Sequence, residues 1–496
     1  MELTQSSVNL SRLILDAWNN YEETTDAIVP DTFPDISRIA AVYGNPQLKD
    51  DTPQSGRVLI SGSVRMTVLY VPDGGGPLCR LDIPISFAHI EEAAGINEDS
   101  QLFVSCRVVA ADAHIMNSRK LSVTATLSIS CRVFVPDTLA LTDGFAGDET
   151  GLEMLTSTHT ITVPVAVHRR EFTLMDDVSL PDGTRYREIA APRAELRLSD
   201  CRLMNGKAVL KGDVALHLLA ITHENTLENA ECVLPFTQIF EVDGMSDNQQ
   251  VCVSFSIRHL DAELRDDGTL AVGLGAGALL TAFETHTLHL VADVYHLEHP
   301  VHVETAPVSI PASHPLAELG CEASETIPVG MKIAQIADVS AVFDTLIQEP
   351  SRTVLRMMAC VVYRSDDGEY YSVHRAVQMP LSLPDGTQQV RLNGMQCRAS
   401  ASISGEDSVV LSLSGRCGLL CEEPLQLSNL SALTVEEGNI ASAAPVSIIL
   451  RYVDAEERLW DIAKCYRTTV DAIRQANQLS ADHLSAHAQM LLIPVQ

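Results

Sequence analysis

A cluster of five histidines is the densest set of potential metal ligands in this sequence. Its members are His286, His289, His296, His299 and His302. Imidazole nitrogens suit zinc, and the HxxH spacing occurs here twice. In an extended strand, however, residues three apart point to opposite faces, so an HxxH pair is poorly placed to share one ion. We therefore expect no metal and interpret the cluster as a polar turn between strands.

No other residue set predicts catalysis or cofactor binding. The chain lacks a Gly-x-Ser-x-Gly elbow and a Walker lysine motif. The adjacent carboxylates Asp176–Asp177 and Glu91–Glu92 diverge in an extended chain, and we interpret them as solvated surface. The glycine run at 273–277 is followed by no long amphipathic helix, so we predict a strand instead of a dinucleotide loop. We expect a protein with no enzymatic activity and no cofactor.

Composition and charge exclude further classes. The 496 residues include 34 Lys or Arg and 65 Asp or Glu, a formal net charge of −31. A nucleic-acid-binding protein needs a basic face, so we expect no nucleic-acid partner. The 46% hydrophobic content is typical of a globular chain.

The ends and cysteines of the chain predict a cytoplasmic protein. The sequence begins Met1-Glu2-Leu3, without the basic start and apolar core of a secretory signal. It holds no apolar run of about 18 residues, so we expect no transmembrane segment. The twelve scattered cysteines are interpreted as buried free thiols in a reducing compartment.

A weak internal repeat with a period near 150 residues organises most of the chain. Segments of alternating apolar and polar residues begin at Gly56, Gly206 and Arg352. Period-two alternation bounded by Asp, Gly and Pro predicts strands joined as hairpins. A lone hairpin cannot bury its apolar face, so two sheets must pack together in each repeat.

We therefore predict a mainly β fold of three β-sandwich-like repeats. Their boundaries are 1–145, 146–310 and 311–435. The bridge at 145–200 also looks extended, so fusion of the first two repeats into one unit remains open. A linker rich in small residues follows at 436–446.

The last fifty residues, 447–496, change period. A short strand at 446–453 is followed by apolar residues at helical spacing from Leu459 to Tyr466. Thr468 and Asp471 form a weak capping pair before a second helix that ends at 477–479. A closing strand at 490–494 completes a small α+β domain in the order strand, helix, helix, strand.

This segment resembles a LysM domain. The match rests on the run Leu459-Trp460-Asp461-Ile462-Ala463, on Ala476–Asn477 and on Leu492-Ile493-Pro494. Many members bind N-acetylglucosamine polymers in a groove between two loops. Both loops depart from the family here. Glu456-Glu457-Arg458 replaces Gly-Asp-Thr, and His487–Ala488 replaces Pro-Gly. Because glycine permits close backbone approach and Glu or Arg obstructs it, we favour protein docking over glycan binding.

Trp460 admits two interpretations. It lies beside the buried stripe of the first helix, where it serves either as packing at the rim or as an anchor for a partner. The predicted partner-binding residues are Glu457, Arg458, Leu459, Trp460, Asp461, Lys464, Asn477, Gln478 and Leu479.

The repeats, taken with this terminal domain, resemble the SipL-like spore-coat morphogenetic proteins of clostridia. The stretch Ile28 to Ile39 looks like the Val-Pro-Asp-x-x-Pro-Asp-Ile opening of their β-rich repeats. The resemblance implies a non-catalytic scaffold whose LysM domain binds a SpoIVA-like coat ATPase at the forespore surface in the mother-cell cytoplasm. The repeats would serve as spacers or for self-association. The alternative is a peptidoglycan-binding protein of the cell wall or cortex.

Overall fold

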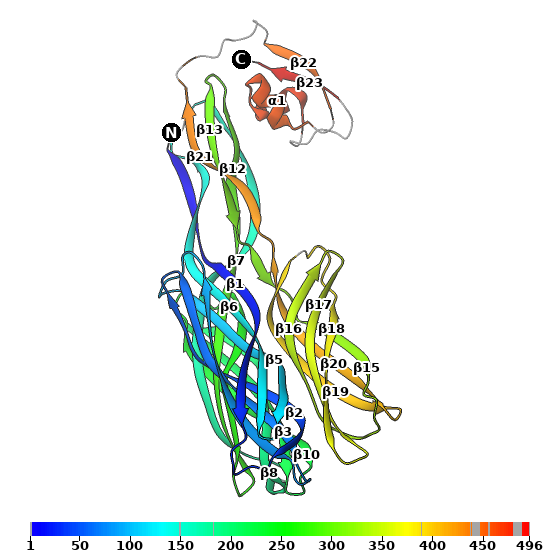
Figure 1. Cartoon of the computed structure of the whole chain (residues 1–496). Helices are drawn as coiled ribbons and strands as arrows, with labels where there is room; N and C mark the ends of the chain where they lie inside the picture. Colours follow the sequence, from blue (N-terminus) through cyan, green and yellow to red (C-terminus); the bar gives the residue numbers. More distant parts are fainter. Residues whose placement is uncertain are drawn as a thin grey trace.

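The chain folds almost entirely into strands, which confirms the predicted mainly β fold (Figure 1). The computed structural model describes residues 2–147, 150–181, 183–387, 389–436, 438, 447–454, 457–479 and 489–495. The predicted linker at 436–446 lies outside the described residues except at 436 and 438. Figure 1 shows a base of packed sheets, a stalk of long strands above it and a small C-terminal module beside the stalk tip.

Three successive sets of strands follow the same order. Repeat 1 holds β1 (Leu3–Ile28), β2 (Ile36–Gln54), β3 (Arg57–Pro72), β4 (Cys79–Glu92), β5 (Gln101–Asn117) and β6 (Lys120–Phe145). Repeat 2 holds β7 (Leu152–Ser179), the short 3-10 helix η1 (Gly183–Arg185), β8 (Tyr186–Met204), β9 (Lys207–Thr222), β10 (Leu227–Glu241), β11 (Gln250–Leu264) and β12 (Thr269–His296).

Repeat 3 includes the strand Val301–Ile310, which pairs with Leu425–Val435, so it begins before the predicted boundary at 311. It divides its long strands into shorter pieces. It holds β13 (Val301–Ile310), β14 (Ser313–Pro315), β15 (Leu319–Pro328), β16 (Ile333–Glu349), β17 (Arg352–Ser365), β18 (Tyr370–Leu381), β19 (Val390–Ser404), β20 (Ser408–Glu422) and β21 (Leu425–Val435). The breaks fall at Pro311 and Pro424. Proline lacks the amide hydrogen that a continuous ladder needs, so the strands separate there.

Two sheets pack face to face in each repeat, as the alternating sequence requires. In repeat 1 the sheet β2-β3-β4 covers the sheet β1-β6-β5. Repeat 2 pairs β8-β9-β10 with β7-β12-β11, and repeat 3 pairs β16-β17-β18 with the β15-β20-β19 sheet. Each sandwich encloses its own apolar core.

A crowded glycine marks the same place in repeats 1 and 2. A Cβ atom on Gly62 would lie 2.3 Å from the carbonyl oxygen of Gln47, and one on Gly212 would lie 2.1 Å from that of Arg197. Phe87 and Phe236 press on these two glycines from the other side. Only glycine fits where a ring and a neighbouring strand approach so closely.

The three repeats meet around a common centre. The strands β2, β8 and β16 each carry a β-bulge at an equivalent alanine, namely Ala40, Ala190 and Ala337. These three alanines share one buried cluster, to which all three repeats contribute. The bulges bend the strands at their point of contact, so the repeats close on one another instead of forming an open row.

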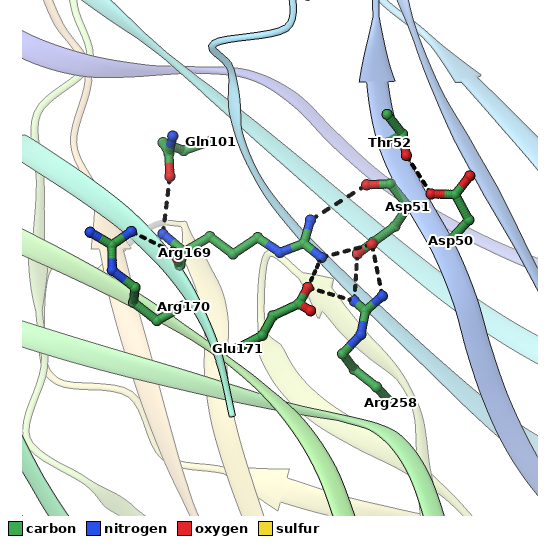
Figure 2. Close-up of polar contacts among 8 residues, drawn as sticks. All are labelled: Asp50, Asp51, Thr52, Gln101, Arg169, Arg170, Glu171 and Arg258. Carbon is green, nitrogen blue, oxygen red and sulfur yellow. Dashed lines mark hydrogen bonds and ion pairs between the residues drawn. The ribbon is translucent and has the colours of Figure 1, made fainter. Parts of the chain in front are cut away.

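Repeats 1 and 2 are also joined by a buried ion cluster (Figure 2). Asp51 of β2 lies between Arg169 of β7 and Arg258 of β11, at 2.7 Å and 2.9 Å. Glu171 completes the cluster by pairing with both guanidinium groups. Two arginines donate to this buried carboxylate, so the cluster favours these two repeats in contact.

Three ribbons form the stalk above the base. They are the distal halves of the antiparallel pairs β1–β6 and β7–β12, and the pair β13–β21. Their inner faces share an apolar core that includes Leu10, Ile161 and Ile310, one from each repeat.

The C-terminal module has the predicted strand, helix, helix, strand order. Its elements are β22 (Ile448–Val453), α1 (Leu459–Tyr466), α2 (Val470–Asn477) and β23 (Gln489–Pro494). The predicted cap at Thr468 is wrong by one residue. Thr469 caps α2, because its hydroxyl accepts the amide of Ala472 at 3.0 Å. Thr468 is buried instead, and its carbonyl faces the stalk.

The histidine cluster is mostly strand, contrary to the predicted turn. His286 and His289 lie within β12, and the turn starts after His296. Within the described ranges, no group of three His, Cys, Asp or Glu side chains is arranged to hold a metal ion. The predicted strand at 273–277 is confirmed as part of β12. All twelve cysteines are free thiols, but only five of them are buried as predicted. Six are half-buried, and Cys465 on α1 is exposed.

Candidate interaction surfaces of the C-terminal module

One flank of α1 is docked on the tip of β12. The indole nitrogen of Trp460 donates to Asp293 at 2.8 Å, and the ammonium of Lys464 lies 2.7 Å from both oxygens of the same carboxylate. Trp460 is only 7% exposed as a result. The tryptophan is therefore an anchor, but one that holds the module to the stalk of its own chain.

Tyr295 extends the same contact. Its ring meets Trp460 edge to face with centroids 4.8 Å apart, and its hydroxyl donates to the carbonyl of Thr468 at 2.7 Å. Arg467 adds a hydrogen bond to the carbonyl of His296 at 3.2 Å. Asp293 and Tyr295 point to the same side of β12, because they are two residues apart in a strand.

The charge of Asp293 is fixed by this contact. Burial raises the pKa of its carboxyl, but the hydrogen bonds from Lys464 and Trp460 outweigh burial, so the pKa lies below its usual value. The carboxylate therefore stays ionised and holds both donors.

The residues before α1 are engaged within the module. Glu457 pairs with Arg451 of β22 at 2.5 Å and accepts the amide of Asp454. Arg458 pairs with Asp461 at 2.8 Å, and both side chains are well exposed. Glu456 and the loop at 487–488, two of the departures from the LysM pattern, lie outside the described residues.

Four further predicted residues have structural roles. Leu459 is buried in the core of the module, and Leu479 packs against that core. Asn477 joins α2 to β23, since its amide donates to the carbonyl of Leu492 at 2.6 Å and its oxygen accepts that residue's amide at 2.7 Å. Gln478 ends α2 in the left-handed conformation. Direct partner contact by any of the nine predicted residues stays a prediction.

The outer face of the β22–β23 sheet is apolar and exposed. Leu450 lies opposite Leu492, and Tyr452 lies opposite Met490. These four side chains and Ile448 are each between 39% and 68% exposed. The other face of the sheet packs on α1 and α2, so the sheet is apolar on both sides. An exposed apolar cluster of this kind is typical of a protein–protein contact.

Family comparisons agree with this architecture. The model of the SipL SPOCS domain matches residues 35–116 and 187–265, and the LysM domain model matches residues 453–494. The chain is a SipL-like protein with a C-terminal LysM domain. The SPOCS matches coincide with β2 to β5 and β8 to β11, and β16 to β19 repeat that order outside the matched ranges. Comparisons with curated proteins and with solved structures found no match.

Both matched families consist of non-catalytic domains, and the SPOCS match makes this SipL-like chain a sporulation-related protein. Neither helix within the described ranges has the length and apolar character needed to span a bilayer.

Sequence reasoning singled out Trp460 and Lys464 on the α1 flank, but it missed their contacts in the stalk and the whole outer sheet face. Asp293 and Tyr295 interrupt an apolar strand, which gives no hint of a contact with residues far along the chain. The outer face could have been recognised from the sequence. A strand with one buried face alternates apolar and polar residues, whereas Ile448, Ile449 and Leu450 are all apolar.

Proposed function

We propose that this SipL-like protein is a non-catalytic scaffold of spore-coat assembly that binds a SpoIVA-like coat ATPase through its LysM domain. The three SPOCS-type repeats would form a base and stalk that carry the domain, in the mother-cell cytoplasm at the forespore surface. The observation that carries the proposal is the exposed apolar face of the β22–β23 sheet.

Two surfaces of the LysM domain compete for this role. The α1 flank holds the strongest anchor, Trp460, but that side chain is already packed on Tyr295 and bonded to Asp293. The outer sheet face has no such contact among the described residues, and its Leu450 and Tyr452 are the kinds of side chain that contribute most when buried by a partner. We therefore assign partner docking to the outer sheet face.

The distribution of charge favours docking at this end. Residues 447–496 hold five Lys or Arg and six Asp or Glu, whereas the whole chain holds 34 and 65. The LysM domain is nearly neutral on a strongly acidic chain, so an acidic partner would meet less charge repulsion there than at the base.

A truncation tests the proposal. Affinity capture from sporulating cells should recover the coat ATPase with the full chain and not with a chain that ends at residue 440. Equal recovery by both chains would refute docking through the LysM domain. Sedimentation of the full chain with insoluble peptidoglycan, without ATPase capture, would instead favour the glycan-binding alternative.

A further inference from the structure

A partly open cavity of about 700 Å³ lies in the base where the three repeats meet. The strands β2 and β5 of repeat 1, β8 and β11 of repeat 2, and β16 and β19 of repeat 3 all contribute to its lining. Its volume falls in the range typical of small-molecule sites. The cavity exists only while all three repeats are assembled, so a ligand bound in it would affect the stability of the whole base.

The lining is unusually basic for this chain. Six arginines and three carboxylates face the cavity, although acidic residues outnumber basic ones almost two to one in the sequence. Four of the arginines are held in ion pairs, which are Arg65–Asp261, Arg80–Asp82, Arg193–Asp338 and Arg197–Glu195. The two that remain are Arg107 and Arg398.

Arg107 is positioned but not neutralised. Its guanidinium carbon lies 5.8 Å from the ring centres of both Trp18 and Phe343, which hold it by cation–π contact. Among the residues that the structure describes, its guanidinium has no ion pair and donates no hydrogen bond. Its five donors are therefore free to bind a carboxylate or phosphate in the forked geometry that arginine favours.

Neighbouring positive charge favours the binding of an anion near Arg107. Burial lowers the pKa of Arg107 below its usual value. The pKa of Arg132 is lowered to about 10, first by burial and then in part by the positive charges of Arg391 and Arg107. Arg107 therefore lies near a second cation, Arg132, although Arg132 itself does not line the cavity.

A second hollow adjoins the cavity. It shares Glu195, Arg197 and Arg398 with the cavity and adds Glu322 and Arg416, so three arginines and two carboxylates line it. Arg398 and Arg416 are exposed, so they can attract an anion toward the cavity.

We propose that the cavity between the three repeats binds a small polyanion, with Arg107 as the residue that holds a phosphate or carboxylate group. Such a ligand would join the repeats and stabilise the assembled base. This site is separate from the LysM domain, so its test does not depend on partner docking.

Thermal unfolding and calorimetric titration of the full chain test the site, with pyrophosphate and citrate as probes. At least one probe, at up to about 10 mM, should raise the melting temperature of the natural chain and of Arg57→Gln, an exposed control. Tighter binding of pyrophosphate would indicate a phosphate ligand, and tighter binding of citrate would indicate a carboxylate ligand. Arg107→Gln should lose the shift, and Arg107→Lys should bind about tenfold more weakly.

The buffer without anion provides the second readout. There Arg107→Gln should melt no lower than the natural chain, because it removes a buried cation that lacks a counter-charge. A purely structural arginine would instead lower the melting temperature and leave any anion effect intact. That result, or the absence of binding by either probe to the natural chain, would overturn the proposal.

Discussion

Arg193 of repeat 2 and Asp338 of repeat 3 form a two-pronged ion pair at the centre of the base, with distances of 2.7 and 2.6 Å. The hydroxyl of Tyr43 in repeat 1 donates to the same carboxylate at 3.1 Å. One carboxylate thus ties together all three repeats. Asp338 follows the bulged Ala337, at a position where repeats 1 and 2 carry Ala41 and Ala191.

Removing this carboxylate should destabilise the base. Asp338 is 1% exposed, so Asp338→Asn leaves Arg193 without its counter-charge in a buried site. We expect a loss of about 3 kcal/mol in the free energy of unfolding, measured by urea denaturation. Asp177→Asn is the matched control, because its pair with Arg265 is exposed and should change stability by less than about 0.5 kcal/mol. Equal effects of the two variants would contradict the assignment.

The crowded glycine of repeat 2 gives a packing test. In Gly212→Ala the new methyl group meets the carbonyl of Arg197 and the ring of Phe236. We expect a loss of about 1–3 kcal/mol, measured by the same denaturation. Gly273→Ala is the control, since a Cβ atom there has nothing within 4 Å and should be neutral or slightly stabilising. If Gly212→Ala leaves the free energy of unfolding unchanged, the strands are less closely packed here than described.

The LysM domain should separate from the stalk when Asp293 loses its charge. Trp460 fluorescence can be isolated in a Trp18→Phe background, because the chain has two tryptophans. Asp293→Asn should increase quenching of Trp460 by acrylamide severalfold, since the indole then loses its cover. Asp471→Asn, on the exposed side of α2, should leave quenching unchanged. Unchanged quenching in Asp293→Asn would mean that apolar packing alone holds the contact.

Acid should release the same contact in a defined range. The pKa of Asp293 is lowered in the folded chain, so its contribution is fully present above the unfolded value of about 3.9 and is lost as the pH falls through the folded value. Trp460 quenching should therefore stay constant from about pH 7 to pH 5 and rise below about pH 4. Asp293→Asn should show high quenching throughout, and a transition of the natural chain near neutral pH would contradict this account.

The local pattern of apolar and polar residues was enough to predict the strands and the order of strands and helices in the LysM domain. Alternation around Gly56 and Gly206 reflects burial of one face, and the helical spacing from Leu459 reflects the core of the small domain. These signals are local because a strand or helix is amphipathic over neighbouring residues.

The contacts between elements could not be predicted in this way. Trp460 and Asp293 are 167 residues apart, and nothing in the local sequence of either determines that they meet. The same holds for the closure of three repeats around Ala40, Ala190 and Ala337, where the bulges depend on strand pairing. Sequence therefore predicted the mainly β fold and the order of the LysM elements, while the contacts between elements required the fold.

The most direct test of the central claim is a binding titration between the full chain and the coat ATPase. Leu450→Glu and Tyr452→Glu each place a charge on the outer face of the β22–β23 sheet, and Gln475→Glu adds the same charge to exposed α2 as a control. We predict that each sheet variant weakens the dissociation constant by at least about tenfold, with Trp460 quenching unchanged, and that the control binds like the natural chain. Full affinity in both sheet variants would contradict the claim that this face holds the partner.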